Sequence, residues 1–133
     1  GYDFSSKIVK INEKDSVELQ IYDTSGNKNA RSIVLNKLKA SDCCVFTVSF
    51  SNYKQDINFI KDNYPSSINT WEKKPKFIVA VTQCDLYIKD KQADITHRIK
   101  DRIQNDKSLS FLHNASFVSS SAVNGDTLEL ENA

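Results

Sequence analysis

The residues most able to do chemistry in this 133-residue chain lie in three short polar segments, each directly after an apolar, strand-like run. The segments are Asp-Thr-Ser-Gly at 23–26, Thr-Gln-Cys-Asp at 82–85 and Ser-Ser-Ala-Val-Asn-Gly at 120–125. In an open parallel sheet, the carboxyl ends of the strands border the crevice in which ligands bind. One such turn could simply end a strand in a loop, as most do. Three turns of this composition predict one ligand site assembled from separate parts of the chain.

Other reactive side chains give weaker signals. Cys43, Cys44 and Cys84 are odd in number and lack the spacing of a zinc site or a disulfide framework, so we interpret them as buried structural thiols. His97 and His113 are isolated from any nucleophile or carboxylate in a catalytic spacing. We therefore predict no nucleophilic or zinc-dependent catalysis.

Composition favours a single globular domain over residues 1–133, because 39% of the residues are hydrophobic and 26% are charged. A formal net charge of +1 provides no field that would attract nucleic acid or an anionic membrane. The sequence has no apolar run of about 18 residues, no signal segment and no lipidation cysteine at its end. We expect a cytoplasmic chain without direct membrane insertion, attached to membranes, if at all, through parts outside these residues.

Periodicity predicts that strands and helices alternate around the polar segments. Alternating apolar residues predict a β-hairpin formed by 4–12 and 16–23. Continuous apolar runs at 43–50 and 76–81 are typical of central strands covered on both faces. A last short strand is predicted at 115–121.

Isoleucines at helical spacing, among them Ile57 with Ile60 and Ile95 with Ile99, predict helices between these strands. A turn at Asn124-Gly125 follows the last strand. The order β, β, α, β, α, β, α, β calls for an α/β fold. We expect an open, mostly parallel sheet with one antiparallel hairpin strand, right-handed crossovers and flanking helices.

The polar segments resemble the nucleotide-binding motifs of small GTPases of the Ras superfamily. Asp23-Thr24-Ser25-Gly26 resembles their Asp-x-x-Gly motif, and Thr82-Gln83-Cys84-Asp85 resembles their Asn/Thr-Lys/Gln-x-Asp guanine motif. Ser121-Ala122 resembles their Ser-Ala-x motif. The start of the chain is similar to Rab proteins, whereas the Thr-Gln-x-Asp and Ser-Ala segments are more similar to Rho proteins. The resemblance implies a P-loop-NTPase-like G domain, of which this chain represents the later part.

The resemblance assigns a role to each motif. Asp23 would hold Mg²⁺ through water, and the backbone N–H of Gly26 would approach a γ-phosphate. The carboxylate of Asp85 would accept hydrogen bonds from guanine N1–H and the exocyclic amine, while the stem of Gln83 lies over the base. The N–H of Ala122 would donate to guanine O6. The implied nucleotide-binding residues are Gly26, Thr82, Gln83, Asp85, Ser121, Ala122 and Val123, with GTP or GDP and Mg²⁺ as cofactors of an intact parent.

Phosphate binding in this family requires Gly-x-x-x-x-Gly-Lys-Ser/Thr, which this sequence lacks. Placed on the family, Gly1 follows switch I, so the first strand, the P-loop and the first helix are missing. The sequence is therefore either a fragment of a longer GTPase or a remnant that has lost the site, and we expect these residues alone to be inactive. The absent strand would leave an exposed or reorganised seam between 16–23 and 43–50. Direct pairing, a strand donated by a partner or dimer, or a segment outside this sequence could close it.

Two further expectations concern hydrolysis and partners. Asn27 stands where the family has the Gln that orients the attacking water, and its shorter stem predicts slow hydrolysis even in a complete protein. Phe4, Tyr22 and Leu38 fall near the apolar positions that Rab-like proteins present to effectors or regulators. The same three side chains are also compatible with half-buried positions of the sheet and core.

The sequence thus favours a Rab- or Rho-like small GTPase domain, a guanine-nucleotide-dependent switch in membrane traffic or signalling with a degenerate or truncated site. A pseudo-GTPase that acts as a protein-interaction scaffold and binds no nucleotide stays open. A remote alternative is a phospho-acceptor α/β domain in which Asp23 or Asp85 takes a phosphoryl group. That chemistry requires a cluster of acids with a Lys, which neither aspartate has beside it in the sequence.

Overall fold

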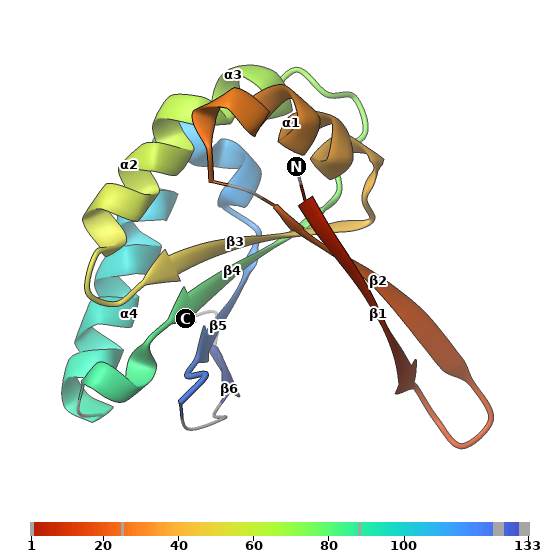
Figure 1. Cartoon of the computed structure of the whole chain (residues 1–133). Helices are drawn as coiled ribbons and strands as arrows, with labels where there is room; N and C mark the ends of the chain where they lie inside the picture. The colour runs from red at the N-terminus through yellow and green to blue at the C-terminus, as the bar shows by residue number, and fades with distance from the viewer. Residues whose placement is uncertain (1, 25, 88, 124–126, 131–133) are drawn as a thin grey trace. The chain divides into compact units, whose positions relative to one another are not determined.

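The computed structural model divides into two compact units, Gly1–Ala40 and Ser41–Ala133, and each is described by itself. The residues that it describes are 2–24, 26–87, 89–123 and 127–130. Figure 1 shows the order of the elements along the chain. Ser25 and the predicted turn at Asn124-Gly125 lie outside the described residues.

The first unit is built on the β-hairpin that the alternating apolar pattern predicts. Strand β1 (Tyr2–Lys10) pairs antiparallel with β2 (Ser16–Thr24), and Phe4 lies opposite Tyr22 in the register. In β2, Tyr22 is half-buried and the other side chains are exposed. The predicted hairpin is confirmed, with strand ends that differ from the prediction by one or two residues.

The hairpin turn is closed by Asn12, and a short helical region follows the second strand. The side-chain oxygen of Asn12 accepts hydrogen bonds from the backbone N–H groups of Lys14 and Asp15, at 2.9 and 2.8 Å. A 3-10 turn, η1 (Lys28–Ala30), leads into helix α1 (Arg31–Ala40). The expected helix between the second and third strands is therefore present.

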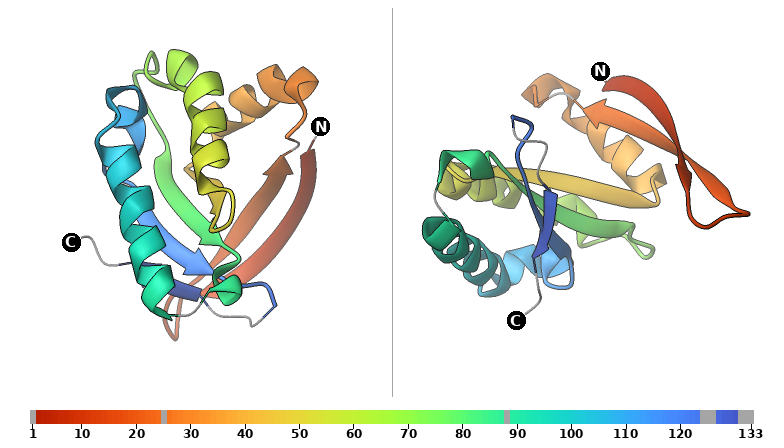
Figure 2. Two further views of the ribbon diagram at one scale, coloured as in Figure 1. Left: turned by 90° about the vertical axis from the view of Figure 1, so that its left-hand side faces the viewer. Right: turned by 90° about the horizontal axis from the view of Figure 1, so that it is seen from below.

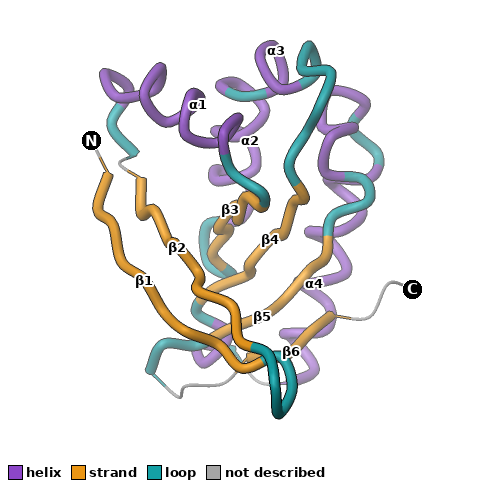
Figure 3. The backbone as a smooth tube through the Cα atoms, turned by 90° about the vertical axis from the view of Figure 1, so that its right-hand side faces the viewer, coloured by secondary structure: helices purple, strands orange, loops and turns teal. Residues whose placement is uncertain are grey.

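The second unit contains a four-stranded sheet of order β3-β4-β5-β6 (Figure 3). Strands β3 (Cys43–Ser49), β4 (Lys76–Thr82) and β5 (Ser116–Ser120) run parallel. Strand β6 (Thr127–Leu130) pairs antiparallel with β5 and was not predicted from the sequence. Three of the predicted strands thus form the parallel sheet, as expected.

Helices connect the parallel strands and cover one face of this sheet. They are α2 (Tyr53–Asn63), α3 (Pro65–Ile68) and α4 (Lys89–Gln104), followed by the 3-10 segment η3 (Lys107–Leu112). Helices α2 and α4 lie in front of the sheet in the left view of Figure 2 and behind it in Figure 3. Proline begins α3, at the helix position where its missing N–H removes no hydrogen bond.

The hydrophobic core lies between this helical layer and the sheet. The helical spacing of the isoleucines is confirmed, because Ile57 and Ile60 of α2 and Ile99 and Ile103 of α4 are all buried. The largest fully buried side chains also include Phe50, Ile68, Leu109, Leu112 and Phe117. The covered face of the sheet is therefore the one that stabilises the second unit.

The prediction that the run at 43–50 forms a central strand covered on both faces is wrong. Strand β3 lies at the edge of the sheet, and its side chains alternate between exposed and buried. Val45 is 56% exposed, and Cys43 is exposed too, so the prediction of a buried thiol fails there. The alternation arises because α2 packs on one face of β3 while the side chains of the other face are exposed.

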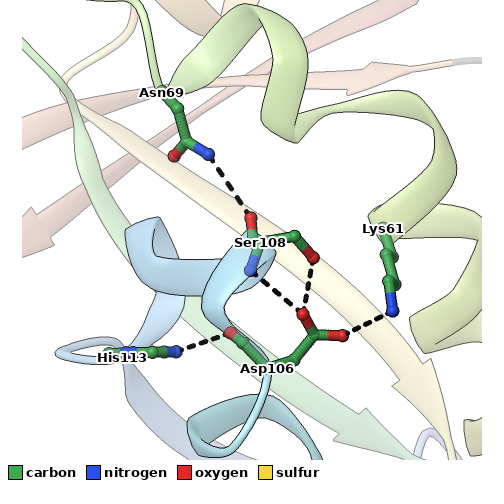
Figure 4. Close-up of polar contacts among 5 residues, drawn as sticks. All are labelled: Lys61, Asn69, Asp106, Ser108 and His113. Atoms are coloured by element: carbon green, nitrogen blue, oxygen red, sulfur yellow. Dashed lines mark hydrogen bonds and ion pairs between the residues drawn. The ribbon is translucent and has the colours of Figure 1, made fainter.

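A cluster of hydrogen bonds and one ion pair connects α2, the end of α3 and η3 in the helical layer (Figure 4). Asp106 caps η3 by accepting hydrogen bonds from the backbone N–H and hydroxyl of Ser108, at 3.0 and 2.6 Å. Its other oxygen lies 3.0 Å from Lys61 Nζ of α2. Asn69 Nδ2 donates to the Ser108 carbonyl at 3.4 Å, and His113 Nε2 lies 2.9 Å from the Asp106 carbonyl oxygen. This cluster explains His113 as a structural residue.

The expected seam between 16–23 and 43–50 concerns strands of two different units. In the first unit β2 pairs with β1, and in the second unit β3 pairs with β4. Which of the three expected solutions closes the seam stays a prediction, because the two flanking strands belong to different units. No helix among the described residues is both long and apolar enough to cross a membrane.

Candidate functional site

The segment after β4 has a special backbone conformation. Gln83 adopts φ 64° and ψ 32°, the left-handed region that residues other than glycine rarely occupy. The 3-10 turn η2 (Cys84–Leu86) begins directly after it. The Phe50 N–H donates to the Thr82 carbonyl at 3.1 Å and ties the end of β3 to this segment. A strained residue at the end of a central strand is typical of functional sites.

Asp85 and Ser121, from two different predicted segments, meet at the carboxyl edge of the sheet. The Ser121 hydroxyl donates to Asp85 Oδ1 at 2.8 Å, although 36 residues separate them. Ser121 is 2% exposed and Asp85 is half-buried, so the bond is partly shielded from water. The convergence that the sequence predicts is therefore present for these two segments. Ala122 and Val123 follow and are exposed.

Two side chains that sequence reasoning missed also contact the segment after β4. Ser51 Oγ donates to Gln83 Oε1 at 2.9 Å, over a separation of 32 residues. Gln92 of α4 donates from Nε2 to the carbonyl oxygens of Cys84 and Tyr87, at 2.5 and 2.7 Å. Neither residue belongs to a recognisable motif, so no local signal in the sequence marks them.

The Asp-x-x-Gly segment lies in the first unit. Asp23 is exposed near the end of β2 and faces Asp3 in the hairpin register. Gly26 has open space where a Cβ would stand, so no contact within the described structure requires glycine there. A need for glycine at this position would arise from close approach of a ligand, which is the role that the resemblance implies.

Asn27 acts locally as a capping residue. Its side-chain oxygen accepts a hydrogen bond from the Asn29 N–H at 3.0 Å, and its carbonyl accepts one from the Ala30 N–H at 3.0 Å. These bonds organise the start of η1. In this conformation the amide oxygen of Asn27 is engaged with backbone rather than presented to a water molecule.

The three candidate partner-binding residues also lie in the first unit. The rings of Phe4 and Tyr22 pack at a centroid distance of 5.1 Å, and Phe4 is 54% exposed. Lys37 of α1 places its Nζ 3.6 Å from the centroid of the Tyr22 ring. Leu38 is half-buried on the same helix. Phe4 thus presents aromatic surface, whereas Tyr22 and Leu38 contribute partly to packing.

The described residues offer little for metal or nucleophilic chemistry. No three His, Cys, Asp or Glu side chains among them gather as a metal centre. Asp23 supplies an oxygen donor of the kind Mg²⁺ prefers, but by itself it does not make a complete site. Burial, and then the neighbouring Cys43, raise the pKa of the Cys44 thiol to about 12, so Cys44 stays neutral and unreactive.

A parallel sheet with a helical layer and polar segments at its carboxyl edge defines the class of α/β nucleotide-binding folds. The model of the Ras family matches residues 1–130, so the chain belongs to the Ras family. It is also 29% identical over 130 residues to the Ras-related protein Rab-4 of Dictyostelium discoideum. That match covers 97% of this chain and 58% of the length of that protein.

Among solved structures, the chain is similar to translation elongation factor SelB from Methanococcus maripaludis, in complex with the GTP analogue GppNHp. The TM-score is 0.56 at 16% identity, over 92% of this chain and 25% of that one. At this identity the likeness shows the fold alone. The predicted resemblance to small GTPases and the predicted G-domain fold class are confirmed. Intact members of the family bind GTP or GDP with Mg²⁺ and interact with effectors and regulators.

Proposed function

We propose that this chain forms the base-recognising part of a Rab-like guanine-nucleotide switch, in which both units belong to one G domain. The observation that carries the proposal is the hydrogen bond between Ser121 and Asp85, which joins two motif segments at the ends of adjacent parallel strands. In this proposal the protein acts in membrane traffic or signalling, in the cytoplasm. Any contact with membranes is made through residues outside this sequence.

Guanine recognition follows from the chemistry of the Asp85 carboxylate. Ser121 donates to one oxygen, and each carboxylate oxygen can accept more than one hydrogen bond. The carboxylate can therefore accept from two neighbouring donors on one edge of a purine, which guanine has and adenine lacks. The backbone N–H of Ala122, an exposed residue, would supply the complementary donor to guanine O6. Thr82, Gln83 and Val123 complete the base site.

Phosphates and Mg²⁺ require residues that this sequence does not contain. Asp23 and Gly26 would take part in holding Mg²⁺ and in sensing the γ-phosphate, as the family resemblance implies. A bound Mg²⁺ would neutralise phosphate charge, but the motif that cradles the phosphates is absent from these 133 residues. Asn27, whose amide oxygen caps η1, would support only slow hydrolysis.

A pseudo-GTPase scaffold is the second candidate, and one observation favours it. At the water-orienting position, the side-chain oxygen of Asn27 accepts a hydrogen bond from the Asn29 N–H and so caps η1. In that function the exposed Phe4 with Tyr22 and Leu38 would bind effector or regulator proteins without a nucleotide. The nucleotide content and intact mass of the purified parent protein separate the two candidates.

Substitution Asp85→Asn tests the base site directly. The substitution turns an acceptor into a donor that faces a guanine donor, which costs roughly 1 to 3 kcal/mol, and xanthine should then be preferred. In a protein that joins these residues to a phosphate-binding loop, the measurement is the ratio of GTP to XTP affinity. For this chain alone we expect at most weak binding, measured by NMR titration with millimolar GMP, XMP and AMP.

The control for that experiment is Asp62→Asn, which changes an exposed aspartate of α2 in the same way. It should leave the guanine-to-xanthine ratio unchanged. If Asp85→Asn leaves the ratio unchanged as well, Asp85 merely ends a strand and the proposed base site is wrong. Low-micromolar binding of GTP by these residues alone would contradict the assignment of phosphate affinity to residues outside the sequence.

A further inference from the structure

We infer that Gln92 and Ser51 are positioning residues that hold the segment 82–87 in its base-recognising conformation before any nucleotide binds. This inference rests on the proposed function for its biological meaning. Its structural content is that two side chains outside the motifs fix the segment from two separate elements. One comes from α4 and the other from the turn that follows β3.

The first observation is the conformation that has to be held. Gln83 lies in the left-handed region at φ 64°, where a side chain with a Cβ is strained. Such a residue persists only when its surroundings supply enough compensating contacts. Directly after it, η2 is short, and its backbone hydrogen bonds are long. The Leu86 N–H lies 3.2 Å from the Gln83 carbonyl, and the Tyr87 N–H lies 3.3 Å from the Cys84 carbonyl.

Gln92 supplies the first contact. One amide nitrogen donates to the carbonyl of Cys84, at the start of η2, and to that of Tyr87, directly after its end. Because an NH₂ group has two protons, it can satisfy both carbonyls at once. The two ends of the turn are thereby bound to a single group on α4. The Gln92 side chain is half-buried, so water competes weakly for these bonds.

Ser51 supplies the second contact, on the strained residue itself. Its hydroxyl donates to Gln83 Oε1 at 2.9 Å. This bond orients the amide of Gln83, whose stem is the part that would lie over the base. The neighbouring bond from the Phe50 N–H to the Thr82 carbonyl holds the preceding residue. The side chain and the backbone of the segment are therefore both tied to the residues that follow β3.

With Ser121 on Asp85, side chains from three separate places contact the described segment 82–87: the turn after β3, helix α4 and the residue after β5. Ser121 belongs to a predicted motif, whereas Ser51 and Gln92 do not. Preorganised groups bind more tightly because less conformational freedom is lost on binding. The geometry thus assigns to Ser51 and Gln92 a part in guanine affinity without contact to the base.

The test measures hydrogen exchange of the Leu86 and Tyr87 amides by NMR on the whole chain without nucleotide. Gln92→Met keeps the length of the side chain and removes its donors, and Gln92→Glu replaces the donors by acceptors. We expect exchange at both amides to accelerate about tenfold in each variant, while Val79 and Val81 of β4 stay protected. Protection of β4 shows that the variant is folded.

Four further variants separate positioning from a general loss of structure. Gln92→Lys retains N–H donors on a long stem and should restore exchange to within about threefold of the wild type. Gln104→Met, on an exposed residue of the same helix, should change nothing. Ser51→Ala should accelerate hydrogen exchange of the Leu86 and Tyr87 amides about threefold. Ser51→Thr, which keeps the hydroxyl, should leave the exchange rates unchanged.

Titration with GMP distinguishes failure of this inference from failure of the proposed function. If Leu86 and Tyr87 exchange at wild-type rates in both Gln92→Met and Ser51→Ala, the positioning role is overturned. If the segment loosens as expected and GMP affinity falls by a similar factor, the inference is supported in full. If the segment loosens but the wild type shows no preference for GMP over AMP, the proposed function fails and the structural role of both residues stands.

Discussion

The two units carry different motif segments and differ in how they are stabilised. Of the residues whose burial is described, Ala30 and Val34 are the buried hydrophobic ones of the first unit, whereas the second unit buries eighteen. Conversely, the exposed large hydrophobic residues are concentrated in the first unit. They include Phe4, Ile8, Val9, Ile11, Val17, Leu19, Ile21 and Ile33.

The difference separates a motif segment that its own unit supports from one that lacks such support. The segment with Asp85 is held by side chains of its own unit, next to a packed core. The segment with Asp23 ends a two-stranded hairpin, and a hairpin alone is marginally stable in water. Val9 lies opposite Val17 on its apolar face. Because these side chains are exposed, the hairpin needs further packing against them to stay folded. We expect the two units to respond differently to substitution.

The largest expected contrast is between two phenylalanines. Phe117 is 1% exposed in β5, so Phe117→Ala should lower the free energy of unfolding by about 3 to 5 kcal/mol. Phe4 is 54% exposed in the hairpin, and Phe4→Ala should cost less than about 1 kcal/mol, chiefly its contact with Tyr22. Urea denaturation of both variants measures the contrast. Equal losses would show that the hairpin is as tightly packed as the core.

A smaller effect is expected at the polar cluster of the second unit. The Ser108 hydroxyl and the Lys61 ammonium hold the pKa of Asp106 below its ordinary value. A lowered pKa contributes stability that is present above about pH 4 and is lost as the pH falls through the folded-state pKa. Asp106→Asn should therefore lower the free energy of unfolding by about 1 kcal/mol at pH 7. The difference in this free energy between the variant and the wild type should shrink below about pH 4.

Thermal unfolding between pH 3 and pH 7 measures this dependence. Asp94→Asn, which changes an exposed carboxylate of α4, is the matched control and should show little loss at pH 7. If the difference in stability between Asp106→Asn and the wild type grows towards low pH, the stabilising role assigned to the ionised Asp106 carboxylate is wrong.

The smallest effect is expected in the first unit, where Lys37 lies over the ring of Tyr22. Lys37→Gln removes the cation and should weaken the attachment of α1 to the hairpin by about 0.5 to 1 kcal/mol. Hydrogen exchange of the β2 amides should accelerate about two- to fivefold, with Lys10→Gln, an exposed lysine of the same hairpin, as the control. Unchanged exchange would mean that this contact does not stabilise the unit.

The sequence by itself determined the elements and the motif positions. Alternating residues define the hairpin, and isoleucines four residues apart define α4, because side-chain periodicity follows directly from strand and helix geometry. The order of the polar segments likewise placed Asp85 and Ser121 at one edge of the sheet. These predictions succeed because each depends on residues close together in the chain or on the direction of parallel strands.

The tertiary structure decided everything that depends on neighbours from distant positions. Strand β3 has the apolar run of a central strand, yet it is an edge strand whose outer face lies exposed, since coverage is set by which helices pack where. Ser51 and Gln92 carry no motif, yet they reach Gln83 and the carbonyls around η2. A side chain's hydrogen-bond partner depends on the folded path of the chain, which local sequence does not encode, and that is why these contacts could be found in the structure alone.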